Sequence, residues 1–120
     1  MITEDELARI ALALPGVAHE GRAFAIGGKG FAWTWNERVT PGKPRVPNPD
    51  VLAVRVANEQ EKQELIAADP ATFFTEPHYN GFPAVLVRLA AVDAAELTEL
   101  LTDAWRTLAP KTLLKEFDAR

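Results

Sequence analysis

Apolar residues near the start of the chain recur with the spacing of an amphipathic helix. Four of them fall on one helical face: Leu7, Ile10, Ala11 and Leu14. Thr3 and Glu6 precede this stripe in the pattern of a capping box, which satisfies free amide groups of a first helical turn. Pro15-Gly16 follows the stripe and interrupts helical geometry. A helix is therefore predicted between Thr3 and Leu14.

Helical spacing returns in the second half of the chain. Residues 59–68 carry Leu65 and Ile66 against a charged face, after the potential cap Asn58. Asp93 and Glu96 repeat the capping-box pattern before the longest stripe, which ends at Pro110. The residues of that stripe are Leu97, Leu100, Leu101, Ala104, Trp105 and Leu108. A short final helix over residues 111–117 is also predicted.

Between the helices the apolar period changes to two, as in β-strands. Arg22–Ile26 and Lys29–Trp35 are alternating runs joined by Gly27-Gly28, and glycine tolerates the positive φ of a tight hairpin turn. On the second run Phe31, Trp33 and Trp35 are predicted to share one face. Further strands are predicted over residues 51–57 and 84–89, and Phe73-Phe74 begin another apolar stretch.

The apolar residues in the segment 37–50 follow neither the helical spacing nor the alternation of a strand. The segment contains several prolines with interleaved basic residues, so it is predicted to form an extended basic loop. The whole order, a helix, strands, a helix, strands and a helix, favours one α+β domain over residues 1–120. We expect an antiparallel sheet flanked by N- and C-terminal helices, rather than a doubly wound parallel sheet.

Composition narrows the chemistry. The chain has 120 residues and no cysteine, which excludes disulfides, zinc–thiolate sites, iron–sulfur clusters and cysteine nucleophiles. Its acidic start is unlike a signal peptide, and charges interrupt every apolar run. We therefore expect a cytoplasmic protein that does not enter a membrane.

Charge is distributed unevenly along the chain. The net charge is −4, yet Arg22 to Arg55 contains six basic residues and two acidic ones. A basic hairpin on an acidic body could attract an anion to one face, although ordinary solubilising charges would give the same count. If the partner is duplex DNA, the expected phosphate contacts are Lys29, Arg38, Lys43 and Arg45. Arg22, Arg55 and Arg88 are further candidates on strands.

Residues 75–81 concentrate polar side chains. Glu76 and His78 could form a general base, but the chain offers no convincing nucleophile or second acid. A structural loop that turns at Asn80-Gly81, with His78 hydrogen-bonded to the backbone, is therefore favoured, and no enzyme activity is predicted. Neither a metal site nor a cofactor is expected, since the two histidines lack ligand spacing. The alternative to DNA binding is a small-molecule or peptide cleft. Its candidate residues are Glu76, His78, Tyr79, Trp33 and Trp35.

Two further features of the sequence, a glycine-rich segment and a pair of tryptophans, have simpler explanations than a ligand site. Gly27 to Gly30 lacks the full phosphate-loop pattern and lies between strands, so a hairpin turn is favoured. Trp33 and Trp35 could stack nucleobases, but they alternate with the small Ala32 and Thr34, which favours packing in the core.

Several strings along nearly the whole chain resemble the MmcQ/YjbR family. They are Leu14–Val17, Gly28–Ala32, Pro77–Leu89, Asp103–Arg106 and Ala109–Lys111. The resemblance implies a small bacterial α+β protein whose sheet and helices are likened to the double-wing motif of DNA-binding proteins. It implies DNA binding by analogy of fold and supplies no catalytic residues.

Overall fold

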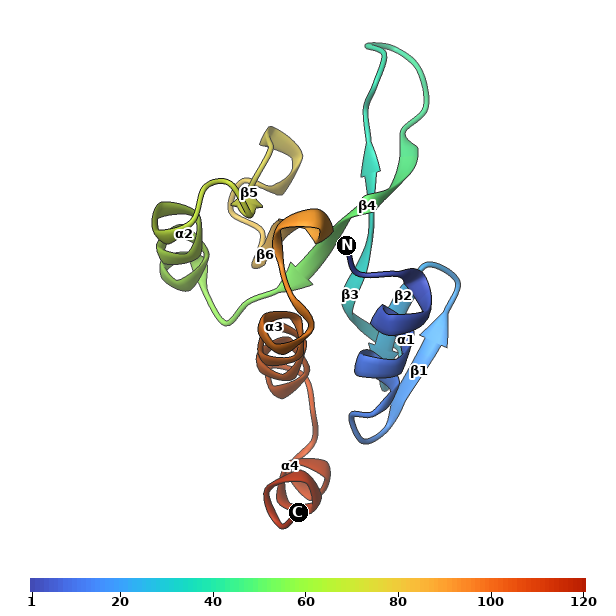
Figure 1. The fold of residues 1–120 in the computed structure, drawn as a ribbon, viewed down its shortest axis with the longest axis vertical. Helices are drawn as coiled ribbons and strands as arrows, with labels where there is room; N and C mark the ends of the chain where they lie inside the picture. The colour runs from blue at the N-terminus through green and yellow to red at the C-terminus, as the bar shows by residue number, and fades with distance from the viewer.

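The computed structural model describes residues 1–120 and contains one six-stranded sheet in which every neighbouring pair is antiparallel (Figure 1). The strand order is β1-β2-β3-β4-β6-β5. The strands span β1 Val17–Glu20, β2 Ala23–Ile26, β3 Lys29–Glu37, β4 Val46–Arg55, β5 Phe73–Phe74 and β6 Ala84–Arg88. The predicted α+β class with an antiparallel sheet is confirmed.

Four α-helices and two 3₁₀ turns complete the chain. They are α1 Glu4–Leu12, α2 Glu59–Ala68, η1 Pro77–Tyr79, η2 Leu89–Ala91, α3 Ala94–Arg106 and α4 Lys111–Asp118. Thr3 and Glu6 form the complete capping box, and Asn58 and Asp93 each accept the predicted hydrogen bond from the amide three residues ahead. No helix has the length and apolar character needed to span a bilayer.

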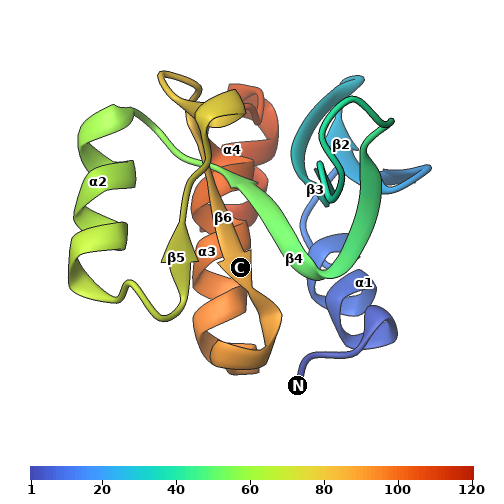
Figure 2. The ribbon, with the colours of Figure 1, turned by 90° about the horizontal axis from the view of Figure 1, so that it is seen from above.

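One face of the sheet is covered by α1 and α3. Together they bury a cluster of twenty residues that includes Leu7, Phe31, Leu97 and Trp105. The indole Nε1 of Trp105 donates a hydrogen bond to the Pro15 carbonyl at 2.9 Å, which joins the end of α3 to the end of α1. Figure 2 shows α1 beneath β2 and β3, and α3 beside β6 and β5.

A β-bulge changes the predicted orientation of the second strand. Phe24 pairs with Ala32 and Ala25 with Gly30, so Phe31 is an extra residue on β3. As a result Phe31 packs under the helices, while Trp33 and Trp35 lie on the opposite face of the sheet. The predicted common face for Phe31, Trp33 and Trp35 is therefore wrong, because strict alternation does not survive a bulge.

The prediction of a loop over residues 37–50 is also wrong at its end. Strand β4 begins at Val46 and pairs with β3 through Pro47 and Asn48, so the true loop is residues 38–45. Proline is tolerated here because β6 pairs only with residues 51–55, which leaves the first half of β4 on a free edge. Residues 36–48 form a two-stranded β3–β4 arm that projects beyond the other strands in Figure 1.

Candidate functional site

The face of the sheet opposite α1 and α3 carries a cleft of about 310 Å³. Strand β3 forms its floor, and residues 75–83, here called the covering segment, form one wall. Six residues line it: Trp33, Asn36, Arg45, His78, Tyr79 and Phe82. A concave, partly aromatic surface with a few polar groups is the usual form of a small-ligand site.

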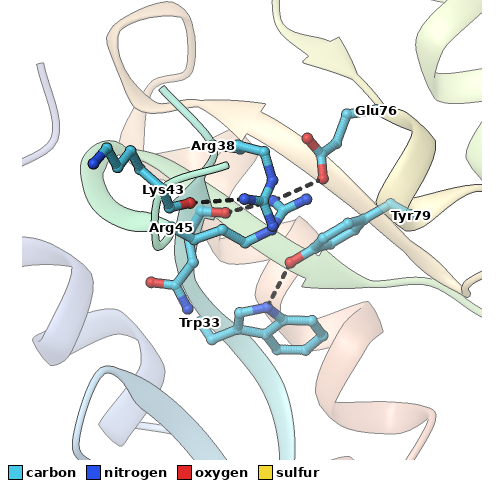
Figure 3. Close-up of polar contacts among 7 residues, drawn as sticks. Trp33, Arg38, Lys43, Arg45, Glu76 and Tyr79 are labelled. Carbon is cyan, nitrogen blue, oxygen red and sulfur yellow. Dashed lines mark hydrogen bonds and ion pairs between the residues drawn. The ribbon is translucent and has the colours of Figure 1, made fainter. Parts of the chain in front are cut away.

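Aromatic side chains set the shape of this cleft. The Trp33 indole Nε1 donates a hydrogen bond to the Tyr79 hydroxyl at 3.0 Å, which fixes both rings (Figure 3). Phe82 meets the Trp33 ring edge-on, with centroids 6.2 Å apart, and is itself 42% exposed. The Trp33 and Tyr79 rings are therefore held in place, while the Phe82 ring remains open to solvent.

The covering segment owes its path to a tight turn. The Phe82 amide donates to the Tyr79 carbonyl at 3.0 Å, and Gly81 has φ +77° at the third position of that turn. With Asn80 extended at the second position, this is a type II turn, which needs a residue that accepts positive φ. The predicted Asn80-Gly81 turn is confirmed.

Lys62 of α2 anchors the same segment from behind. Its side chain is fully buried, and Nζ donates to the carbonyls of Tyr79 at 2.6 Å and Phe82 at 3.1 Å. Both acceptors belong to residues that line the cleft. A buried ammonium that bridges two carbonyls makes strong, charge-assisted hydrogen bonds, so α2 holds the wall in place.

Arg45 and Glu76 meet at the edge of the cleft. One nitrogen of Arg45, Nη1, donates to the Glu76 carboxylate at 3.2 Å and to the Asn36 carbonyl at 2.8 Å (Figure 3). The side chains are 23% and 18% exposed, so the pair is partly shielded from water. This contact joins the β3–β4 arm to the covering segment.

The arrangement gives His78 no catalytic partner. Glu76 is engaged by Arg45, and His78 is exposed with no hydrogen bond to any side chain or to the backbone. The backbone hydrogen bond expected for His78 in the structural-loop interpretation is therefore not formed. No three His, Asp or Glu side chains gather as metal ligands.

Trp35 differs from its neighbour Trp33. It is 7% exposed, packs edge-on against Phe74 and does not line the cleft. Its indole Nε1 is buried without a hydrogen-bond partner, as is the Thr75 hydroxyl. Of the predicted cleft residues, Trp33, His78 and Tyr79 line it, Glu76 lies beside it, and Trp35 is core, as its alternation with Ala32 and Thr34 suggested.

The candidate phosphate contacts do not form one surface. Lys29 begins β3, whereas Arg38 and Lys43 lie beyond the other end of that strand. Arg38 donates to the Lys43 carbonyl at 2.7 Å, and Arg45 is neutralised by Glu76. Arg38 and Lys43 therefore form no ion pair, and the Lys43 side chain makes no hydrogen bond within the protein.

Of the three further arginine candidates, Arg88 and Arg55 are engaged within the protein and Arg22 is not. Arg88 lies over the Phe74 ring at 4.0 Å and reaches two carbonyls at the end of α2. Arg55 lies 5.8 Å from the Phe82 ring centroid. Arg22 is exposed at the start of β2, on the far side of β3 from β4.

Three residues of the site were not found from the sequence. Lys62 stands among glutamate and glutamine residues and resembles a surface lysine, although its i, i+3, i+4 spacing to Leu65 and Ile66 places it on the inner face of α2. Asn36 and Phe82 carried no local signal, because the cleft brings β3 and the covering segment together over a long sequence separation.

The fold and the site define an α+β protein with one antiparallel sheet, helices on one face and an aromatic cleft on the other. The crystal structure of Deinococcus radiodurans protein DR2400, with a DUF419 domain, has this fold, with a TM-score of 0.65 and 23% identity over 98% of this chain and 89% of that chain. A YjbR family model matches residues 12–107. The chain belongs to the YjbR family.

Sequence relatives occur in mycobacteria. The chain is 40% identical over 124 aligned residues to Uncharacterized protein Rv2570 of Mycobacterium tuberculosis and to Uncharacterized protein Mb2600 of Mycobacterium bovis. Each alignment covers 98% of this chain and 96% of the relative. The resemblance to the MmcQ/YjbR family noted from the sequence is confirmed.

Proposed function

We propose that this protein is a binding module without catalysis, and that its ligand is a small molecule with a planar aromatic group held in the cleft beside Trp33. The observation that carries this proposal is the cleft itself. Its aromatic groups Trp33, Tyr79 and Phe82 offer ring faces and edges, and Asn36 and His78 add polar groups. Aromatic ligands bind such surfaces by stacking and by burial of apolar area.

The rigidity of the wall supports the same proposal. Lys62 fixes the backbone at Tyr79 and Phe82, and the Trp33–Tyr79 hydrogen bond fixes the rings. A preformed site spends less free energy on ordering itself when a ligand binds.

The three tryptophan indole N–H signals in a proton–nitrogen NMR spectrum test this function. Titration with adenosine or indole-3-acetamide, two neutral planar probes, is expected to move the Trp33 signal. The Trp105 signal is the internal control, because that ring is buried under the helices on the other face. A titration that moves no indole signal, or moves Trp105 as much as Trp33, contradicts the proposal.

A second candidate, duplex DNA binding through the β3–β4 arm, is favoured by one observation. The arm projects beyond the sheet, and its exposed loop carries Arg38 and Lys43 (Figure 1). A hairpin of this kind can follow a phosphate backbone without reading bases.

DNA binding is tested by measuring the anisotropy of a labelled duplex with the protein at about 50 and about 200 mM salt. Affinity that comes from phosphate contacts falls steeply over that range. The double substitution Arg38→Gln and Lys43→Gln is expected to weaken binding. Lys29→Gln, at the other end of β3, is the matched control with little effect. No binding at low salt, or equal losses in both variants, contradicts binding through the arm.

A further inference from the structure

The guanidinium of Arg45 has donors that the protein does not use. Both of its hydrogen bonds, to Asn36 and to Glu76, start from Nη1. Nε and Nη2 also carry N–H groups, make no hydrogen bond within the chain and are not among the buried polar atoms without a partner. Because Arg45 lines the cleft, these N–H groups are available to a ligand there.

The geometry of a guanidinium selects the kind of ligand group that these donors can hold. Adjacent N–H groups of arginine match the two oxygens of a carboxylate or phosphate, and the resulting hydrogen bonds are charge-assisted. The Trp33 and Phe82 rings line the same cleft. One ligand could therefore contact the aromatic groups with a ring and Arg45 with an anionic oxygen group.

Glu76 already supplies such a group. Its carboxylate contacts Arg45 through a single hydrogen bond, at 3.2 Å, instead of the paired bonds that a guanidinium can form. Its charge also cancels the charge of Arg45 where a ligand anion would bind. Glu76 therefore opposes any anionic ligand of the cleft.

We propose that the ligand is a planar aromatic molecule bearing a carboxylate or phosphate, and that Glu76 is its internal competitor for Arg45. This inference rests on the proposed function, because it assigns the ligand class of the same cleft. Binding of the anion replaces the Glu76 carboxylate on Arg45 or shares the guanidinium with it. The affinity for the ligand then depends on how well its anionic group competes with the Glu76 carboxylate for the Arg45 guanidinium.

Matched pairs of probes test this competition by calorimetric titration. Indole-3-acetate is compared with indole-3-acetamide, and adenosine monophosphate with adenosine, so that each pair differs chiefly in charge. In the wild-type protein the anionic member is expected to bind no more than a few-fold more tightly. In Glu76→Gln the anionic member is expected to gain roughly tenfold in affinity, because the opposing charge is gone, while the neutral member is unchanged.

Two variants separate this effect from general changes in charge or fold. Glu37→Gln removes a carboxylate from the same arm that does not contact Arg45, and is expected to change affinity much less. Arg45→Gln is expected to abolish the preference for the anionic probes while retaining the neutral ones. The carboxylate and phosphate pairs show which anionic group the cleft prefers.

The outcomes distinguish this inference from the function on which it rests. Neutral probes that bind wild type, with Glu76→Gln leaving anionic affinity unchanged, overturn the competition and leave the aromatic cleft standing. An equal gain in Glu37→Gln also overturns it. If no probe binds any variant, both proposals fail.

Discussion

On the helix-covered face of the sheet, twenty buried residues form one cluster, and on the opposite face six buried residues form another. The two faces also differ in how their polar groups are satisfied. Under the helices, the Trp105 indole donates to a carbonyl. On the other face, the Trp35 indole of the smaller cluster is buried without a partner, as is the hydroxyl of Thr75 in the covering segment.

This difference separates stability from binding. A large cluster with satisfied polar groups supplies most of the free energy of folding, because burial of apolar area is the dominant favourable contribution. The smaller cluster is held by a few specific contacts, from Lys62, Tyr79 and Arg45. Loss of one of these contacts should therefore alter the cleft before it unfolds the protein.

The largest expected effect is the loss of stability in Trp105→Phe, and Trp35→Phe gives the matching measurement for the opposite face of the sheet. Trp105→Phe removes the hydrogen bond to Pro15, leaves a buried carbonyl unpaired and opens a cavity, so it should lower the free energy of unfolding by about 3 kcal/mol. Trp35→Phe also removes part of a buried ring, but the donor that it removes has no partner, so it should cost about 1 to 2 kcal/mol less than Trp105→Phe. Urea denaturation of both variants measures the difference, and equal costs would show that the faces do not differ in this way.

Lys62→Met should have the next largest effect, a loss of about 2 kcal/mol in the free energy of unfolding. It removes the charge-assisted donor from the Tyr79 and Phe82 carbonyls, which then keep only the backbone amides of Phe82 and Ala84. The NMR signals of residues 79–83 should shift more than those of α3. Gln63→Met, at an exposed neighbouring position on α2, is the control and should stay within about 0.5 kcal/mol of wild type. An unchanged covering segment in Lys62→Met would exclude the anchoring role.

Tyr79→Phe should cost about 1 kcal/mol, since it removes the hydroxyl that accepts from the Trp33 indole. The Trp33 indole proton signal should move and exchange faster with solvent, while the Trp105 signal stays in place. If both signals move, the two faces are coupled more strongly than their separate clusters indicate.

The smallest effect concerns the ion pair between Arg106 of α3 and Asp118 of α4, 2.8 Å apart. The hydrogen bond from Arg106 lowers the pKa of the Asp118 carboxyl in the folded protein. The contribution of this ion pair to the stability of the folded protein is fully present above the pKa of Asp118 in the unfolded chain, near 4. It is lost as the pH falls through the lower pKa that Asp118 has in the folded protein. The difference in unfolding midpoint between wild type and Asp118→Asn should be small at about pH 7, because the pair is exposed, and should shrink as the pH falls toward about 2. A difference that persists at low pH would rule out this ion pair as its source.

Local patterns in the sequence predicted much of the fold. Caps such as Thr3 and the stripe ending at Leu108 depend on neighbours within a few residues, so the sequence displays them directly. Strand β1 was not predicted, because its four residues are largely exposed and lack alternation. The bulge at Phe31 depends on pairing with β2, which no local pattern reports.

The sequence identified several residues of the candidate site, but it did not predict the contacts between them. Trp33, His78 and Tyr79 could be singled out as unusual side chains, and the structure brings them to one cleft. The Arg45–Glu76 pair and the bond from Lys62 to Tyr79 join parts of the chain that are distant in sequence. Arg45 was predicted to contact phosphate, and its ion pair with Glu76 became visible only from the fold.

The prolines of the β3–β4 arm have a consequence for how molecules of this protein meet one another. A projecting strand with a free edge can template further strands from other chains and so begin aggregation. Pro47 in the arm and Pro49 just beyond it lie on that edge of β4, and neither has an N–H group to offer to an incoming strand. The arm can therefore extend from the molecule without acting as a seed for intermolecular sheets.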